Sequence, residues 1–239
     1  MKSPQPITVL FADDHAIVRQ GLCALLRADG GFHIVAEASD GREAVSLALA
    51  LRPDVIVMDI AMPVLNGLEA TRQILATNPA ARVAVLSAHG DDEYIQRMLT
   101  AGAVGFLEKQ SSAEVLTKAL RAIAKGKTFY SPSIARRLAN TANLARDHKG
   151  LIKADTRRIT SREYEVLQLV AEGSANKQIA GTLGISIKTV EKHRQHLMDK
   201  LGIHDTAGLT RHAIATGVIE SAVLLTIAGE ASLPVETSG

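Results

Sequence analysis

The strongest constraint on this sequence is an alternation, over its first 127 residues, of short β-rich apolar runs with stretches of helical period. Alternating strands and helices favour a parallel sheet that is covered by helices on both faces. We therefore predict a doubly wound α/β domain with a five-stranded parallel sheet, and we assume the doubly wound order 2-1-3-4-5 for its strands. The expected strands are Ile7–Phe11, His33–Ala38, Val55–Asp59, Arg82–Ser87 and Gly105–Leu107.

The pattern changes after Gly126, and no further strand is expected beyond this point. Ser131 followed by Pro132 is typical of a helix start and predicts a helix over about Ser133–Ala145. The polar segment 146–158 is expected to be a linker. From Thr160 to Glu220 the sequence indicates a small all-α domain of four short helices.

Capping residues mark the ends of these last helices. Thr160 and Glu163 form a capping-box pattern, and Asp205 can cap the fourth helix. Glycines stand where helices should end, at Gly173, Gly184, Gly202 and Gly217. The expected organisation is an α/β domain (1–127), a helical connector and linker (128–158), a helical domain (159–220) and a tail (221–239). For the tail, a flexible end is favoured over a docking strand.

Length and composition agree with two folded domains. The chain has 239 residues, of which 46% are hydrophobic and 22% are charged, far from the composition of a disordered chain. No apolar run approaches the roughly 18–20 residues that span a bilayer. We therefore expect a soluble, cytoplasmic protein without membrane contacts. The single cysteine, Cys23, excludes an internal disulfide and is expected to be a buried apolar side chain.

The basic charge is concentrated in one segment. Residues 131–220 carry 14 Lys and Arg against 9 Asp and Glu, whereas residues 1–130 carry 13 against 14. This asymmetry is compatible with a nucleic-acid-binding second domain and equally with a solvated basic surface. Tyr164 is the only aromatic residue of 131–220, which argues against base stacking on single strands and favours duplex DNA as the partner.

Polar residues end or directly follow four of the predicted strands. They are Asp13, Asp14, Asp59, Ser87 and Lys109. Each alone has an ordinary structural explanation, such as a helix cap or a surface charge. If strands 1 and 3 are neighbours, as in the order 2-1-3-4-5, three carboxylates should converge at the carboxyl edge of the sheet and require a compensating cation. Oxygen ligands suit Mg²⁺, and Lys109 adds positive charge for an anion such as a phosphoryl group.

Two helices expected near Asn176–Leu183 and Ile187–Leu201 have the size and spacing of a helix-turn-helix. The second would bury Val190, Leu197 and Leu201 and expose a polar face opposite them. Side chains suited to reading bases in the major groove are Lys188, Glu191, Lys192 and Gln195. Side chains suited to phosphate contacts are Asn176, Lys177, Thr189 and Arg194. An ordinary helical bundle with a solvated face would show the same pattern.

The first domain resembles the receiver domain of bacterial two-component response regulators over the whole of 1–127. The resemblance rests on Asp13-Asp14, on Asp59 in MDIAMPVLNG, on Ser87 in VLSA and on Lys109 in AGAVGFLEK. It implies that Asp59 is the phosphoacceptor and that the Asp14 and Asp59 carboxylates bind Mg²⁺. Asp13 would contribute directly or through water, and the Ala61 carbonyl would be a further ligand.

The same resemblance implies roles for the remaining residues of this domain. Lys109 would pair with the phosphoryl group, Ser87 would hydrogen-bond to it, and Phe106 would be the rotating aromatic of the switch. Ala61 and His89 occupy positions that tune the phosphoryl lifetime in the family.

The stretch 159–203 resembles the LuxR-type DNA-binding domain almost end to end, including SREYEVL, NKQIA and ISIKTVEKHR. The opening DDHAIVRQGL is similar to receivers that carry such an output domain. The whole chain therefore resembles a NarL/FixJ-type response regulator.

This resemblance implies a transcription factor that is controlled by phosphorylation. A sensor histidine kinase would phosphorylate Asp59, and a phosphorylation-dependent homodimer would bind duplex DNA, with RNA polymerase as a further candidate partner. Slow self-dephosphorylation would be its only catalytic activity. Two alternatives stay open: a phosphohydrolase or nucleotide-binding enzyme on a similar sheet, although no phosphate-binding glycine motif is present, and a constitutive regulator whose receiver is only a scaffold.

Overall fold

The computed structural model describes residues 5–87, 92–138 and 159–219. The chain divides into two compact units, Met1–Asp155 and Thr156–Gly239. The boundary between the units falls within the predicted linker 146–158. This linker, the end of the predicted helix 133–145, the tail 221–239 and His89 lie outside the described residues.

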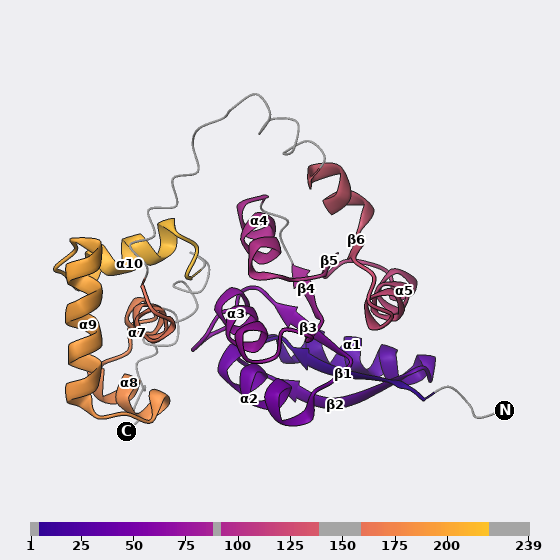
Figure 1. Cartoon of the computed structure of the whole chain (residues 1–239), viewed down its shortest axis with the longest axis horizontal. Coiled ribbons are helices and arrows are strands. Elements are labelled where there is room, and N and C mark those ends of the chain that lie inside the picture. Colours follow the sequence, from indigo (N-terminus) through magenta and orange to yellow (C-terminus); the bar gives the residue numbers. More distant parts are fainter. Residues whose placement is uncertain (1–4, 88–91, 139–158, 220–239) are drawn as a thin grey trace, which may run out of the picture. The chain divides into compact units, whose positions relative to one another are not determined.

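The first unit is built on a parallel sheet with the strand order β2-β1-β3-β4-β5-β6. Its strands are β1 (Ile7–Ala12), β2 (Phe32–Ala38), β3 (Val55–Asp59), β4 (Val83–Ser87), β5 (Gly105–Glu108) and β6 (Phe129–Tyr130). Its helices include α1 (Ala16–Asp29), α2 (Gly41–Leu51), α3 (Gly67–Thr77), α4 (Asp92–Ala101) and α5 (Ala113–Ala124) (Figure 1). The predicted order 2-1-3-4-5 is confirmed, and all neighbouring strands in it pair in parallel.

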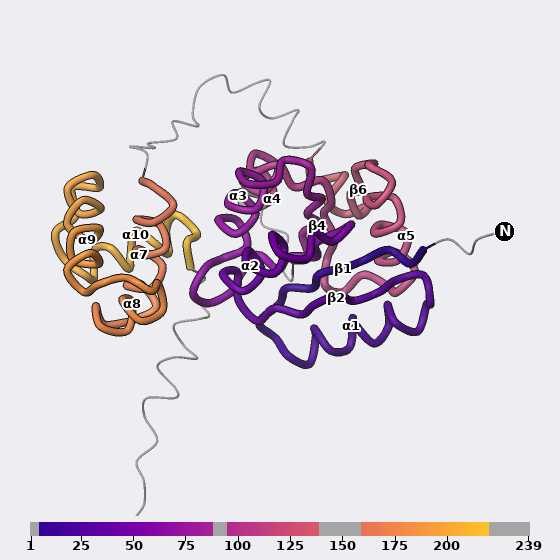
Figure 2. Tube along the Cα trace, turned by 60° about the horizontal axis from the view of Figure 1, so that its bottom comes forward, coloured from indigo at the N-terminus to yellow at the C-terminus, as the bar shows by residue number. Residues whose placement is uncertain are grey.

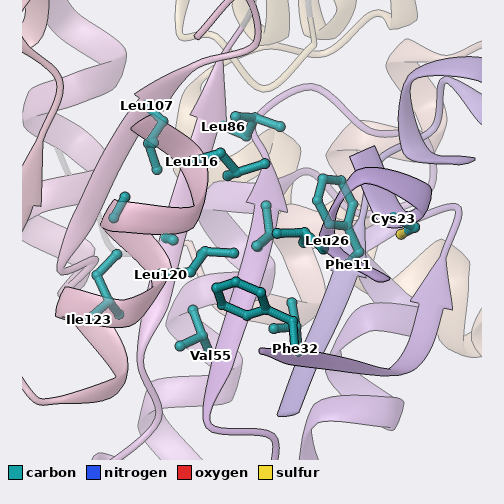
Figure 3. Close-up of a cluster of buried hydrophobic side chains, with 14 residues drawn as sticks. Phe11, Cys23, Leu26, Phe32, Val55, Leu86, Leu107, Leu116, Leu120 and Ile123 are labelled. Carbon is teal, nitrogen blue, oxygen red and sulfur yellow. The ribbon is translucent and has the colours of Figure 1, made fainter. Parts of the chain in front are cut away.

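The central strands β1, β3 and β4 are mostly apolar before their carboxyl ends, as expected for a sheet with helices on both faces. Phe11 packs on one face with Leu26 of α1 and Leu120 of α5 (Figure 3). The next residue toward the N-terminus, Leu10, packs in the cluster of the other face with Ile74 of α3. The helix α1 lies alongside β1 and β2 (Figure 2). Cys23 is fully buried in the first cluster, as predicted.

The strand β6 corrects the expectation that no strand follows Gly126. The Phe129 N–H donates to the Val104 carbonyl at 3.0 Å, and the Ser131 N–H donates to the Phe106 carbonyl at 2.9 Å. Two residues are too few to show an alternating pattern, so only the pairing with β5 defines this strand. A helix follows over residues 132–138, where the sequence predicted one.

The second unit contains the four predicted helices. They are α7 (Ser161–Ala171), α8 (Asn176–Leu183), α9 (Ile187–Leu201) and α10 (Thr206–Ala215). The capping box of Thr160 with Glu163 and the Asp205 cap are present. Gly184 and Gly202 end α8 and α9 in the left-handed conformation that favours glycine. Across both units, none of the helices that the structure describes has the length and hydropathy needed to cross a membrane.

Candidate functional site

Polar side chains from four strands meet at the carboxyl edge of the sheet. Asp13 follows β1, Asp59 ends β3, Ser87 ends β4, and Lys109 follows β5. These positions adjoin because β1 pairs with β3, β3 with β4, and β4 with β5. The structure thus brings the charged residues of the predicted set together, with Asp14 beside Asp13.

The Asp59 carboxylate lies at the centre of this edge, and its side chain is only 5% exposed. Its Oδ2 accepts a hydrogen bond from Lys109 Nζ at 2.7 Å, and its Oδ1 accepts one from the Ile60 N–H at 2.8 Å. The same Nζ lies 2.9 Å from Oδ2 of Asp13, which is fully buried. One ammonium group is therefore shared by two buried carboxylates.

The loop between β1 and α1 supplies the other acidic groups. The Asp13 Oδ1 accepts a hydrogen bond from the His15 N–H at 2.8 Å. The Nδ1 of His15 lies 2.7 Å from Asp14 Oδ1, and the Asp14 side chain is 30% exposed. One ligand atom each from Asp13, Asp14, His15 and Asp59 lies within 4.8 Å of the others. Asp14 forms the side of the cluster that is open to solvent.

Burial raises the pKa of Asp59 to about 7; Lys109 opposes this shift, and Asp13 and Asp14 add to it. Burial by itself would lower the pKa of Lys109, but the Asp59 and Asp13 carboxylates outweigh it and raise that pKa. Lys109 therefore stays protonated and faces several carboxylates. This edge of the sheet has a deficit of positive charge.

The donor set suits a hard divalent cation. Asp13 Oδ2 and Asp14 Oδ1 are buried oxygens that accept no well-aligned hydrogen bond, although Lys109 and His15 lie beside them. Carboxylate oxygens are the ligands that Mg²⁺ prefers, and an open side leaves room for water or a phosphoryl oxygen. The residues at this edge therefore fit Mg²⁺.

The loop after β3 is held close to Asp59 by a glycine. The Gly67 N–H donates to the Ile60 carbonyl at 2.8 Å. A Cβ on Gly67 would lie 1.9 Å from the Asp59 carbonyl oxygen, so only glycine lets α3 start here. Ala61, whose carbonyl was the predicted further ligand, is half-buried in this loop.

Ser87 and Phe106 connect the edge to the interior. Ser87 is 6% exposed, and its carbonyl accepts the Lys109 N–H at 2.8 Å. Phe106 is 1% exposed and packs with Met98 of α4. Its ring stacks on Tyr130 of β6 with 5.7 Å between the centroids. The aromatic side chain is therefore inside the domain, in contact with both neighbouring elements.

The helices α8 and α9 form the predicted pair in the second unit. Val190 and Leu197 are fully buried, and Leu201 is half-buried. The four side chains that the sequence suggests for base contacts are all exposed: Lys188, Glu191, Lys192 and Gln195. The exposed face of α9 therefore carries the donors and acceptors that a major-groove contact needs.

The side chains predicted to contact phosphates have different surroundings. Lys177 is exposed. The Thr189 and Ser186 hydroxyls hydrogen-bond to each other at 2.8 Å. Arg194 donates to Asn176 Oδ1 at 2.9 Å and to Thr206 Oγ1 at 2.8 Å, and so joins α8, α9 and α10. Arg194 and Asn176 thus have partners within the unit.

Sequence reasoning missed four residues near the first site. His15 could have been found because it directly follows Asp13 and Asp14. Arg19 contacts the Asp13 carbonyl, and Glu37 pairs with Arg19, but no local pattern links these two residues. Tyr130 lies against Phe106 only because β6 pairs with β5.

Two family descriptions match this chain. Residues 9–121 match "Response regulator receiver domain", and residues 157–213 match "Bacterial regulatory proteins, luxR family". Together they cover the acidic edge of the sheet and the helices α7 to α9.

Similar proteins include transcriptional regulators. The chain is 35% identical to the transcriptional regulatory protein DegU of Brevibacillus brevis, covering 90% of this chain and 95% of DegU. It is 39% identical to the transcriptional regulatory protein LiaR of Bacillus subtilis, covering 83% of this chain and 92% of LiaR. In a solved structure of two RcsB dimers bound to two parallel DNAs, the RcsB chain is 27% identical to this chain, with a TM-score of 0.54. The match covers 89% of this chain and 99% of the RcsB chain.

Proposed function

This chain belongs to the two-component response regulators of the NarL/FixJ type, in which a receiver domain precedes a LuxR-type DNA-binding domain, and from that premise we propose that phosphorylation of Asp59 controls its binding to duplex DNA. The family consists of transcription factors rather than enzymes. The observation that carries the proposal is the pairing of the buried Asp59 carboxylate with Lys109 at an acidic edge.

Asp59 is the phosphoacceptor in this proposal. A carboxylate oxygen of Asp59 forms a bond to the phosphorus of a phosphohistidine on a sensor kinase, the P–N bond breaks, and the released imidazole takes up a proton. Lys109 holds the acceptor carboxylate in place at 2.7 Å. Because it stays protonated, it also offers positive charge to the incoming phosphoryl oxygens.

Asp13, Asp14, Asp59 and the Ala61 carbonyl are the residues that would hold Mg²⁺. When bound, the cation supplies positive charge that screens the phosphoryl group from the neighbouring carboxylates. Asp13 is fully buried and already paired with Lys109, so direct coordination and coordination through water both remain compatible with its position.

The response to phosphorylation is proposed to run through Ser87 and Phe106. Ser87 would hydrogen-bond to the phosphoryl group, and Phe106 would move within the space between α4 and β6. Because Phe106 contacts Met98 and Tyr130, this movement changes the packing of both elements. The result is a shift of an existing equilibrium toward a receiver that dimerises.

The helix α9 is the proposed recognition helix. Its exposed Lys188, Glu191, Lys192 and Gln195 would read bases, while Asn176, Lys177, Thr189 and Arg194 would contact phosphates or position the helix. A dimer would place two such helices on half-sites about one helical turn apart. We propose that the regulator acts in the cytoplasm, where it would contact chromosomal DNA and RNA polymerase.

We keep the sequence-based domain limits 1–127, 128–158, 159–220 and 221–239 as a proposal, with β6 and the helix 132–138 of the connector packed onto the first domain. Phosphorylation is proposed to end by slow self-dephosphorylation, because a water molecule at the open side near Asp14 can reach the acyl phosphate.

The test compares DNA affinity of the full chain with and without a small phosphodonor and Mg²⁺. Phosphorylation should label the wild-type chain once, tighten its binding to a selected DNA site and require Mg²⁺, and Asp59→Asn should abolish all three effects. Asp54→Asn, at an exposed aspartate of the same domain, is the control. Continuous phosphate release without a retained label would indicate a phosphohydrolase, and equal DNA affinity in both states would indicate a constitutive regulator.

A further inference from the structure

Arg19 of α1 lies beside the acidic edge but has no part in the function proposed above. Its side chain is only 15% exposed, and arginine is rarely buried without a partner. One guanidinium nitrogen, NH1, donates to the carbonyl oxygen of Asp13. Its Nε lies 3.4 Å from Glu37 Oε2. Arg19 thus connects α1, the loop after β1, and β2.

Glu37 provides a fixed point for this connection. It lies in β2 directly beside Phe11 of β1 in the register of the two strands. The Asp13 N–H donates to the Ala38 carbonyl at 3.1 Å, so the first residue of the loop is still held by the sheet. Arg19 adds a second link between this loop and β2, because its guanidinium contacts the Asp13 carbonyl and pairs with Glu37.

The Asp13 carbonyl belongs to the peptide that joins Asp13 to Asp14. The orientation of this peptide determines where both side chains point. Several carboxylates at one edge repel one another, and this repulsion favours rotation of Asp14 toward solvent. We propose that Arg19 is a positioning residue for the acidic edge: by holding the Asp13 carbonyl, it keeps the Asp13 and Asp14 carboxylates converged for Mg²⁺.

The helix α1 also has anchors in the core that do not involve Arg19. The helix α1 is anchored in the core through Cys23 and Leu26, both fully buried. Arg27 offers a natural comparison, because its NH2 lies 2.9 Å from the other oxygen of Glu37. Arg27 is 54% exposed and lies about two turns of helix beyond Arg19, toward the end of α1 that is far from the loop. Loss of either arginine removes an ion pair with Glu37, but only loss of Arg19 frees the Asp13 carbonyl.

The experiment measures Mg²⁺ affinity of the full chain by calorimetry for wild type, Arg19→Gln and Arg27→Gln. Groups that orient metal ligands from outside the coordination sphere typically contribute about 10–100-fold to affinity. Arg19→Gln should weaken Mg²⁺ binding about tenfold, and Arg27→Gln should leave it unchanged. With saturating Mg²⁺, the rate of labelling by acetyl phosphate should stay at the wild-type value in both variants, because Arg19 does not touch the acceptor.

Unchanged Mg²⁺ affinity in Arg19→Gln overturns the proposal, as does equal weakening in Arg27→Gln or a labelling rate that saturating Mg²⁺ does not restore. If Arg19→Gln does not fold by circular dichroism, Arg19→Lys and Arg27→Lys replace the pair, and the weaker Mg²⁺ binding should again belong to position 19. The inference rests on the proposed function for the role of the cation. The two fail separately: Mg²⁺ binding without labelling of the wild type contradicts only the proposed function, and a wild type that binds no Mg²⁺ contradicts both.

Discussion

In the proposed function, a change at Asp59 reaches the sheet through Lys109. Its Nζ lies 2.7 Å from Asp59 and 2.9 Å from Asp13, and its backbone N–H is bonded to the Ser87 carbonyl. A phosphoryl group on Asp59 would add negative charge at the point where Nζ now lies. Lys109 would then form a new ion pair with the phosphoryl oxygens. Movement of its backbone, which follows β5 and is hydrogen-bonded to β4, would shift the ends of both strands.

Lys109→Ala should therefore separate phosphorylation from its effect. Labelling by a small phosphodonor should persist at a reduced rate. The gain in DNA affinity on phosphorylation, about 5–150-fold for a typical coupling between sites, should fall to about one. Lys118→Ala, at an exposed lysine of α5, is the control and should behave as wild type. A full gain in DNA affinity for Lys109→Ala would contradict this role.

At the scale of single elements, the start of α7 is stabilised by charge. Glu163 Oε2 accepts the Thr160 N–H at 2.7 Å and an ammonium hydrogen bond from Lys200 of α9 at 2.6 Å. Burial alone would raise the pKa of Glu163, but the hydrogen bonds from Lys200 and Thr160 outweigh it and lower that pKa. Glu163 thus stabilises the folded state through its charged form.

A lowered pKa means that this stabilisation is fully present above the ordinary glutamate value of 4.5 and is lost as the pH falls through the folded-state pKa. Glu163→Gln should destabilise α7 by about 1 kcal/mol near neutral pH, the usual contribution of a helix cap. The difference from wild type should shrink in acid. Hydrogen exchange of the α7 amides in the full chain measures the stability difference between wild type and Glu163→Gln at neutral and at acid pH. A stability difference that stays constant down to pH 3 would refute the assignment.

The short strand β6 and the helix over 132–138 belong structurally to the first unit. Tyr130 stacks on Phe106, and Ile134 is 1% exposed in the cluster that contains Met98. A fragment ending at 127 lacks both side chains and should be less stable than a fragment ending at 138, by about 3 kcal/mol from the lost apolar burial. Urea unfolding of the two fragments checks this, and equal midpoints would show that the proposed limit at 127 is sufficient.

The exposed face of α9 should distinguish base contacts from phosphate contacts. Lys192→Ala should reduce the binding free energy at a selected DNA site by about 1–3 kcal/mol. It should also reduce the difference in affinity between this site and other sequences. Lys177→Ala, on α8, should weaken all duplexes alike and reduce the salt dependence by about one phosphate contact. Binding titrations at several salt concentrations measure both quantities. The opposite result would mean that α9 is rotated relative to the groove.

At the scale of the whole molecule, the proposed dimer places two recognition helices on one face of the DNA. Inserting about 5 base pairs between the half-sites of a selected site turns them to opposite faces of the duplex. The insertion should abolish the gain in affinity on phosphorylation, and about 10 inserted base pairs should restore part of it. Gel-shift titrations with both inserts test this, and an insertion that leaves the gain intact would indicate binding by independent monomers.

Much of this molecule follows from local pattern. The alternation of strands and helices predicted the parallel sheet, and the capping residues predicted the starts of α7 and α10. Near neighbours along the chain carry this information, because periodicity and capping depend on residues within a few positions of one another. The strand ends likewise identified Asp13, Asp59 and Lys109, since parallel strands bring their carboxyl ends to one edge.

Only the tertiary structure decided how these groups are paired. Lys109 is shared between Asp13 and Asp59, Arg19 holds the Asp13 carbonyl, and Arg194 is bonded to Asn176 and Thr206. A charged side chain has several candidate partners in sequence, and the choice among them depends on which oxygen is within reach once the elements have packed. The strand β6 was likewise decided by the tertiary structure. Two residues are too few to show a period, and they form a strand because they pair with β5.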